Sequence, residues 1–187
     1  MACKTLEAEG IRTLATTLFT LEQAKMAAAV GCTYVAPYVN ALRVHFEPGF
    51  VDVNPGFDVA VQAQRWFEAN GAKTKVLAAS FVNVDEVLKL RGLRHLTVSP
   101  VLLAGLAAKK WDDNDVVESL VEAAVGQVEL EGVGEVAEEA KWRLEVNREG
   151  GGWGAQKLVD AVNIFCGMQE KLELLCGEEL EKVKAEM

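Results

Sequence analysis

The segment KTKVLAASFVNV, residues 73–84, decides the fold of this 187-residue chain. It begins with charged residues, continues through a short apolar run and ends at Ser80 and Phe81. Such a run is typical of a strand buried in a parallel sheet. Functional groups of α/β folds gather where such strands end, so a charged residue is expected there. Instead the chain has Val82.

The same strand-then-helix pattern repeats along the first hundred residues. Further strands are predicted at residues 11–19, 33–39 and 95–99. The helices that follow have start signals: Thr20 with Gln23 three positions later, Asn83 or Asp85, and Ser99 before Pro100. Gly31 and Gly71 are expected to end two of these helices. Alternating strands and helices predict a parallel sheet with right-handed crossovers.

The rest of the chain has a different pattern. Helices are predicted over residues 113–130, 133–146 and 155–183, with a flexible break at 148–154 and a possible interruption near Gly177. No strand is expected after residue 99. We therefore expect one domain, residues 1–187, with four βα units in 1–110 and a helical region in 111–187.

Four strands cannot close a barrel by themselves. A complete (βα)8 barrel, or TIM barrel, needs eight such units. The predicted fold class is therefore α/β, a four-stranded parallel half of a TIM barrel plus C-terminal helices. Two unpaired edges and an apolar inner face would be left in water. We expect a homodimer to cover them, with coverage by the helical tail as the alternative.

The composition narrows the class of partner. With 28 acidic and 19 basic residues, the net charge of −9 repels nucleic acid and anionic membrane surfaces. The N-terminus has no apolar signal core, and no apolar run is long enough to span a bilayer. The four cysteines form no C-x-x-C pair, so we expect reduced thiols in a cytoplasmic protein, without metal or cofactor. A small-molecule ligand remains the expected partner.

Two long segments carry a family resemblance. Residues 9–39, EGIRTLATTLFTLEQAKMAAAVGCTYVAPYV, resemble the middle of transaldolases. Residues 73–106 contain K-T-x-x-x-x-A-S-F-x-N-V and then L-T-x-S-P-x-L-L, and they resemble the seventh and eighth βα units of that family closely. KWRLEVNREGG and AQKLVDAV resemble its terminal helices weakly. The resemblance covers nearly the whole chain but only the second half of a transaldolase.

The resemblance implies a changed active site. The family's Schiff-base lysine lies on the fourth strand and its proton-handling acids lie on earlier strands, so none has a counterpart in this sequence. The family's asparagine of the fifth strand falls at Leu14, and the serine before proline falls at Ala36. Its two phosphate-binding arginines fall at Ala41 and Val82. Since bidentate arginine binding to phosphate is strong, its loss predicts a protein without transaldolase activity.

Three hydroxyl positions are retained, and they are the predicted catalytic residues. Thr16 aligns with a threonine that helps to position the catalytic water. Tyr38 aligns with a phenylalanine of transaldolases and with an acid–base tyrosine of fructose-6-phosphate aldolases. Ser80 aligns with a lumen-facing serine. The alternative is that all three are inherited core residues with satisfied hydroxyls.

Strand alternation predicts which side chains line the lumen. The expected sets are Leu14, Thr16 and Leu18; Tyr34, Ala36 and Tyr38; and Ala78, Ser80 and Val82. Neutral hydroxyls on an apolar wall suit an uncharged ligand. His45, in a rim loop, and Trp153, in a lid-like glycine-rich segment, are further candidates. The full predicted substrate-binding set is Leu14, Leu18, Tyr34, Ala36, Asn40, Val82, His45 and Trp153.

Other reactive residues are expected to have structural roles. His95 begins its strand, on the stability face of such folds. Lys73 precedes its strand and Lys75 is out of phase with the lumen set, so neither is expected to form a Schiff base.

Three functional hypotheses follow from these patterns. The first is a repurposed, cofactor-independent enzyme of lyase, isomerase or cyclase type in specialised metabolism, acting on an uncharged metabolite. The second is a non-catalytic binding or regulatory module. The third is retained aldolase-type chemistry, with a lysine supplied locally or by a partner chain.

Overall fold

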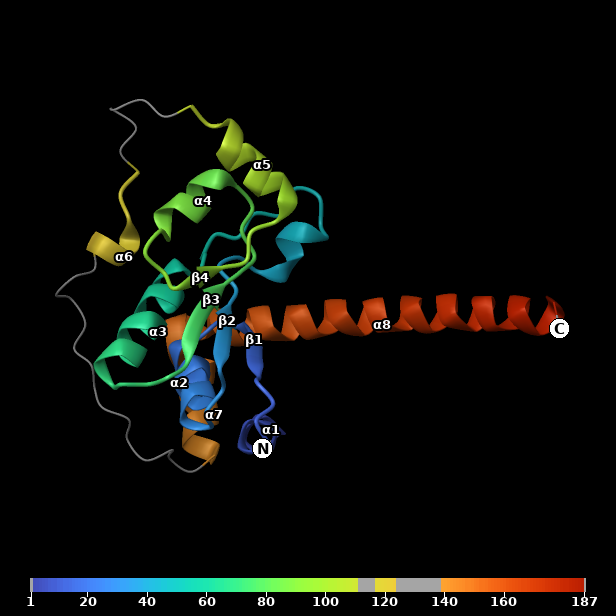
Figure 1. Cartoon of the computed structure of the whole chain (residues 1–187), viewed down its shortest axis with the longest axis horizontal. Coiled ribbons are helices and arrows are strands. Elements are labelled where there is room, and N and C mark those ends of the chain that lie inside the picture. Colours follow the sequence, from blue (N-terminus) through green and yellow to red (C-terminus); the bar gives the residue numbers. More distant parts are fainter. Residues whose placement is uncertain (1, 111–116, 124–138, 187) are drawn as a thin grey trace.

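The chain forms a four-stranded parallel sheet in the order β1-β2-β3-β4 (Figure 1). The computed structural model describes residues 2–110, 117–123 and 139–186. The strands are β1 (Leu14–Leu18), β2 (Tyr34–Pro37), β3 (Lys75–Ala78) and the short β4 (His95–Leu96). Within the described ranges no strand follows β4. The predicted α/β half-barrel is confirmed.

Helices alternate with the strands and then dominate the chain. Their bounds are α1 (Ala2–Ala8), α2 (Leu21–Ala29), α3 (Phe57–Ala69), α4 (Val84–Lys89), α5 (Pro100–Ala108), α6 (Leu120–Ala123), α7 (Glu139–Arg148) and α8 (Trp153–Glu186), with 3-10 turns η1 (Leu42–His45) and η2 (Glu149–Gly152). The helices predicted over 113–130 and 133–146 lie partly outside the described residues. The break predicted between the last two helices coincides with η2, where Gly150 and Gly151 have φ of 59° and 71°. α8 continues through Gly177 without interruption.

The helix starts use the signals found in the sequence. Thr20 and Gln23 form a reciprocal capping box at α2, with Gln23 N–H donating to Thr20 Oγ1 at 3.2 Å. Asn83 caps α4 by accepting from Glu86 N–H at 2.9 Å. Ser99 caps α5, with Pro100 in its first turn. These three predictions are confirmed.

Glu7 ties α1 to the amino ends of β1 and β2. Its Oε1 accepts hydrogen bonds from Thr13 N–H and Thr33 N–H at 2.7 and 2.9 Å, and from both threonine hydroxyls. The bonds from Thr13, followed by those from Thr33, lower the pKa of Glu7 to about 2 against a smaller opposing effect of desolvation.

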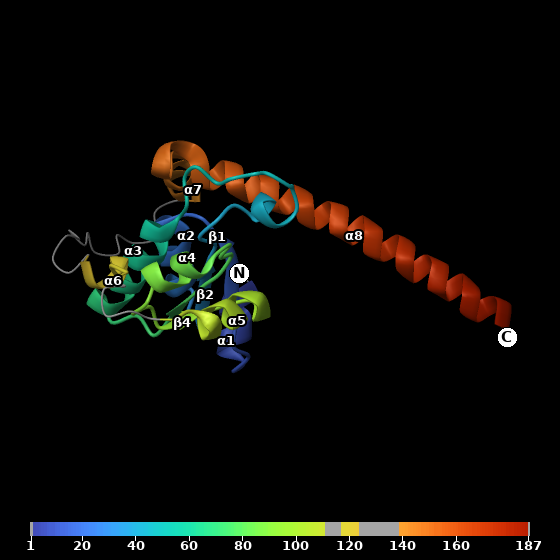
Figure 2. The same cartoon turned by 90° about the horizontal axis from the view of Figure 1, so that it is seen from above.

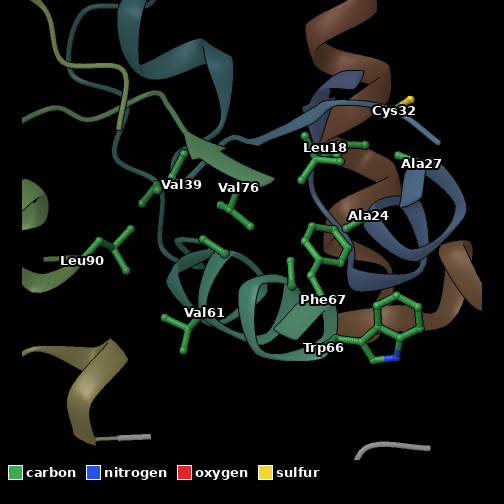
Figure 3. Packing of buried hydrophobic residues seen from close by; sticks show 14 of the residues in the cluster. Leu18, Ala24, Ala27, Cys32, Val39, Val61, Trp66, Phe67, Val76 and Leu90 are labelled. Atoms are coloured by element: carbon green, nitrogen blue, oxygen red, sulfur yellow. The ribbon is translucent and has the colours of Figure 1, made fainter. Parts of the chain in front are cut away.

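The main core lies between the sheet and helices α2 and α3 (Figure 3). Val35 and Val76 of the sheet are buried in this layer together with Val39, which follows β2, and with Val61 and Phe67 of α3. Burying each of these side chains contributes about 1.5–3 kcal/mol. This packing fixes which face of each strand is left for the lumen.

The long helix α8 has a packed part and a projecting part. Near its start, Ala161 is buried with Phe19 and Leu42, and Leu158 and Ile164 pack against them. Beyond this contact α8 extends away from the body, past the β1 side of the sheet (Figures 1 and 2). Among the described residues, no helix combines the length and apolar character needed to cross a bilayer.

Candidate functional site

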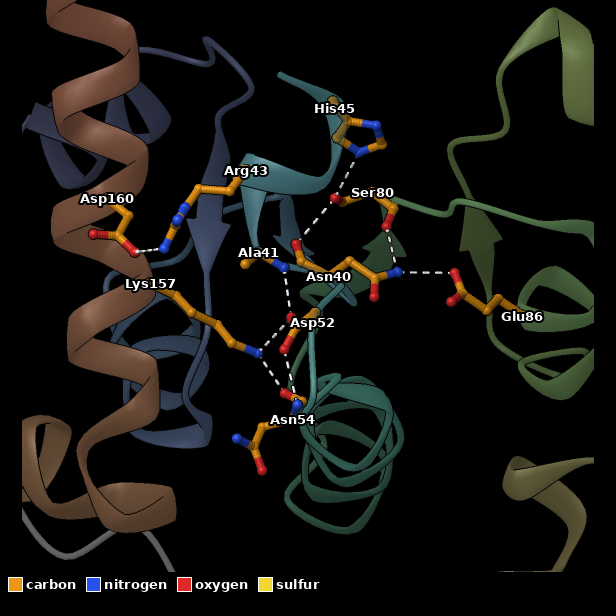
Figure 4. A network of polar contacts seen from close by, with 10 residues as sticks. All are labelled: Asn40, Ala41, Arg43, His45, Asp52, Asn54, Ser80, Glu86, Lys157 and Asp160. Carbon is orange, nitrogen blue, oxygen red and sulfur yellow. Dashed lines mark hydrogen bonds and ion pairs between the residues drawn. The ribbon is translucent and has the colours of Figure 1, made fainter. Parts of the chain in front are cut away.

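A polar network joins the carboxyl ends of β2 and β3 (Figure 4). Ser80 Oγ donates to Asn40 O at 3.0 Å, and Asn40 Nδ2 donates to Ser80 O at 2.9 Å. His45 Nε2 lies 2.9 Å from Ser80 Oγ. Ser80 has a φ of 69°, an uncommon backbone conformation for a residue with a side chain. The network therefore holds the Ser80 hydroxyl in a fixed position beside an imidazole.

Glu86 provides the negative charge of this network. Its Oε2 accepts from Asn40 Nδ2 at 2.8 Å and from Val82 N–H at 3.0 Å. The carboxylate lies in the first turn of α4, where the helix dipole stabilises it. Donors that would suit a bound anion at this position are therefore already used by a carboxylate of the protein.

A second cluster fixes α8 to the rim loop. Asp52 Oδ2 lies 2.7 Å from Lys157 Nζ and accepts from Ala41 N–H at 2.7 Å. Asp52 Oδ1 accepts from Asn54 N–H at 2.9 Å, and Lys157 also donates to Asn54 O. Only 4% of the Asp52 side chain and 9% of the Lys157 side chain are exposed. Burial alone would raise the pKa of Asp52, but the bonds from Lys157, Ala41 and Asn54 together hold it below its usual value.

Arg43 is another cation near this rim, and it too has partners. Its guanidinium lies 2.7 Å from Glu47 and 3.9 Å from Asp160 of α8. It also lies over the ring of Phe50, 4.2 Å from the centroid. Both Arg43 and Lys157 are therefore neutralised by neighbouring carboxylates.

The three predicted catalytic hydroxyls have different surroundings. Thr16 is exposed on the edge strand β1, opposite Ala36 in the register. Tyr38 is half-buried, with its ring edge-on to Phe19 at 5.8 Å. Within the described part of the chain, neither the Thr16 nor the Tyr38 hydroxyl has a hydrogen-bond partner. Of the three, Ser80 is the one that the structure joins to His45 and Asn40.

Two lumen assignments from strand alternation are wrong. A bulge between Thr16 and Leu18, with Thr17 at a φ of 59°, shifts the register so that Leu18 is buried in the core on the helix side. Ala78 lies two residues after Val76, on the same face, and is also buried in that core. The alternation rule failed in β1 because it assumes a strand without a bulge.

The other predicted ligand contacts occupy scattered positions. Ala36 is buried and Leu14 and Val82 are exposed. Tyr34 begins β2 and packs edge-on against His95, with centroids 5.5 Å apart, at the amino end of the sheet. Lys75 is exposed on the face of β3 opposite the core residues Val76 and Ala78, so the prediction that it is out of phase with the lumen face is wrong. Tyr34 is therefore remote along its strand from the rim position of Ser80.

Trp153 belongs to a different cavity. This cavity of about 370 Å³ lies between the starts of α3 and α8, and Phe19, Asn54, Glu149 and Lys157 also line it. None of His45, Ser80 and Asn40 lines it. Burial raises the pKa of Glu149, although it accepts hydrogen bonds from the Leu21 and Glu22 N–H groups at the start of α2. The structure thus separates Trp153 from the Ser80 network.

The sequence patterns did not identify Glu86, Asp52 or Lys157. Glu86 had a usable signal, because it follows the Asn83 cap by three residues. Asp52 and Lys157 are 105 positions apart, and no local pattern links them.

Comparison with known proteins gives a consistent family match. The family model described as Transaldolase/Fructose-6-phosphate aldolase matches residues 1–173. A transaldolase of Shewanella loihica is 31% identical over 185 residues, one of Shewanella amazonensis is 30% identical over 184, and one of Alteromonas mediterranea is 29% identical over 191. Each alignment covers 96% of this chain and 55% of the relative. The chain thus spans about half the length of these relatives.

Proposed function

The chain belongs to the transaldolase/fructose-6-phosphate aldolase family, and from this premise we propose that its rim binds an uncharged small molecule in place of a sugar phosphate. The observation that carries the proposal is the hydrogen bond from Val82 N–H to Glu86 Oε2, with a length of 3.0 Å. Family resemblance puts a phosphate-binding arginine at Val82. A carboxylate beside that position repels a phosphate dianion.

The surrounding cations support the same proposal. Phosphate recognition needs cations with free donors, and bidentate arginine is the strongest form. Arg43 engages Glu47 and stacks on Phe50, while Lys157 engages Asp52. The other family arginine position is Ala41, whose N–H already donates to Asp52. Binding a phosphate here would require breaking existing ion pairs.

The proposed chemistry is a cofactor-independent lyase, isomerase or cyclase step without transaldolase activity. Such steps move a proton between substrate atoms, so they need a base and an acid near the ligand. His45 supports this role: because Ser80 Oγ donates to Asn40 O, His45 Nε2 donates to Ser80 Oγ at 2.9 Å, and Nδ1 is the ring nitrogen that would accept a substrate proton. We assign Tyr38 as a second acid and Thr16 as a hydroxyl that orients the ligand. Leu14, Ala36, Asn40 and Val82 would form the neutral wall.

We propose that the working unit is a homodimer. Each copy has two sheet edges, at β1 and β4, that pair with no further strand in the described part of the chain. Thr16 lies on the β1 edge, so the lumen around it is open until another chain covers it. The cytoplasmic location expected from the cysteine pattern stays a prediction.

Site variants test this proposal directly. A panel of uncharged hydroxylated metabolites is first screened for ligands that raise the Tm, and any turnover is then followed by NMR. We expect Ser80→Ala and Tyr38→Phe to weaken binding by about 5–30-fold each, as expected for the loss of one hydrogen-bonding group. Glu68→Ala, on the outer face of α3, is the matched control and should bind normally.

The variants also decide between the enzyme and the binding module. Ligand binding without turnover in the native chain would favour a non-catalytic module. If Tyr38→Phe and Thr16→Val leave both binding and turnover intact, the site assignment is wrong.

Aldolase-type chemistry is a second candidate, because the chain contains one buried lysine near the rim. Lys157, however, is paired with Asp52 at 2.7 Å, and an ammonium held in an ion pair has no free electron pair for attack. Borohydride treatment with fructose is therefore expected to give no covalent adduct by mass spectrometry. An adduct on Lys157 would revive the Schiff-base mechanism.

A further inference from the structure

The apolar face of α8 continues beyond the body of the protein. At the start of the helix, Leu158 and Ala161 pack against Phe19 and Leu42. At helical spacing the same face continues through the distal stripe, which we define as Val162, Phe165, Met168, Leu172, Leu175 and Val183. All six are exposed, with Leu172 at 53%. Half of the helix thus carries a packing surface without a partner among the described residues.

The direction of α8 indicates where the partner of the distal stripe would lie. The helix contacts β1 and η1 and then projects past the β1 edge of the sheet in both views (Figures 1 and 2). Any chain that continued the sheet beyond β1 would therefore lie alongside the projecting part of α8.

A second unpartnered apolar surface lies at the opposite edge of the sheet. α5 follows β4, its sequence PVLLAGLAA is apolar throughout, and none of its nine residues is buried. Val101 is 80% exposed and Leu103 is also exposed. Helices that are apolar all round are normally covered. The chain thus has one such surface at each free edge.

We propose that a second copy of this chain covers both surfaces, with the distal stripe of each α8 lying on α5 of the other copy. A twofold axis along the barrel keeps all eight strands parallel and puts β1 of each copy beside β4 of the other. Because α8 passes β1 and α5 follows β4, this symmetry brings the two exposed helices together twice. The inference rests on the proposed homodimer and names its contact surfaces.

The charge and the length of α8 favour α5 of a second copy as the partner of the distal stripe. From Phe165 to Lys184 the helix carries five glutamates and three lysines, whereas α5 carries no charged residue. Pairing α8 with another α8 would place two acidic helices together, whereas pairing with α5 brings no like charges together. The twenty residues from Phe165 to Lys184 are about 30 Å long, enough for an extended contact.

Paired substitutions on α8 test the inference. The wild-type mass is measured by light scattering and sedimentation over a wide concentration range, and we expect a dimer. Leu172→Glu on the distal stripe should raise the dimer Kd by roughly 100-fold, because it buries an unpaired charge. Leu174→Glu is the matched control, since Leu174 is 70% exposed on the opposite face of the same helix. The Leu174→Glu variant should have the same dimer Kd as the wild type.

A variant of α5 identifies the occupant. Leu103→Glu should weaken the dimer as strongly as Leu172→Glu, and circular dichroism checks that each variant folds. If Leu172→Glu dissociates the dimer and Leu103→Glu does not, the stripe binds something other than α5, and the inference is overturned. A dimer unaffected by Leu172→Glu also overturns it but leaves the homodimer standing. If the wild type is a monomer at every concentration, both the α8–α5 contact and the proposed homodimer are overturned. The proposed ligand binding at the rim is not affected by this result, because the binding screen tests it separately.

Discussion

Asp52→Ala is expected to lower the free energy of unfolding by about 3–5 kcal/mol, because it leaves the buried Lys157 ammonium without a counterion. Asp52 also satisfies the N–H groups of Ala41 and Asn54, so three donors lose their acceptor together. The loss should be seen in urea unfolding at neutral pH and should loosen the attachment of α8. A change below about 1 kcal/mol, the range of exposed pairs, would contradict this account.

An exposed ion pair is the matched control for Asp52→Ala. Glu68 of α3 lies 3.1 Å from Arg94, and both side chains are well exposed. Glu68→Ala should therefore cost no more than about 1 kcal/mol. The double variant Asp52→Leu with Lys157→Met should recover only part of the lost stability, because it removes the unpaired Lys157 charge but leaves the Ala41 and Asn54 N–H groups without this acceptor.

The pH dependence of stability follows from the same carboxylate. The folded state lowers the pKa of Asp52, so its contribution is fully present above the unfolded pKa of about 3.9. That contribution is lost as the pH falls through the folded pKa. The difference between wild type and Asp52→Ala should therefore narrow in acid. Glu149 acts in the opposite sense, since its raised pKa makes folding less favourable as the pH rises through its titration.

Gly154→Ala is expected to lower the free energy of unfolding by about 1–3 kcal/mol through overpacking. A Cβ at residue 154 would lie 2.4 Å from Thr20 Cγ2 and 3.0 Å from Phe19 O. Thr20 cannot easily move, because its side chain caps α2. The helix α8 should therefore shift away from the rim, and hydrogen exchange of its first turns would report this.

Gly167→Ala distinguishes this clash from a general effect of alanine. Gly167 is also in α8, and a Cβ there meets no atom within 4 Å. The same substitution should raise the free energy of unfolding by up to about 1 kcal/mol, because alanine favours the helix. Equal effects of the two substitutions would show that the close approach at Gly154 is unimportant.

The sequence predicted the fold well because its signals are local. Caps at Thr20, Asn83 and Ser99 and short apolar strands specify the order of elements without tertiary information. The failures have a different origin. The bulge at Thr17 depends on how β1 meets β2, and it moved Leu18 from the predicted lumen into the core.

The candidate site was less predictable than the fold. Ser80, His45 and Asn40 were identified individually, but their mutual hydrogen bonds depend on the turn at Ser80 and on η1. The Asp52–Lys157 pair joins residues 105 positions apart and leaves no local pattern. Trp153 was placed near the rim because its segment was interpreted as a lid, whereas the segment is the tight turn between α7 and α8.

The central claim is that this rim prefers an uncharged ligand to a phosphorylated one. The most direct test is a titration of the ¹⁵N-labelled chain with fructose and, separately, with fructose 6-phosphate. Chemical shifts are followed at His45, Ser80 and Val82. The account predicts that the phosphate group adds no affinity, and that adding it weakens any binding of the neutral sugar. Tighter binding of fructose 6-phosphate by tenfold or more, about 1.4 kcal/mol, with shifts at these residues would contradict it.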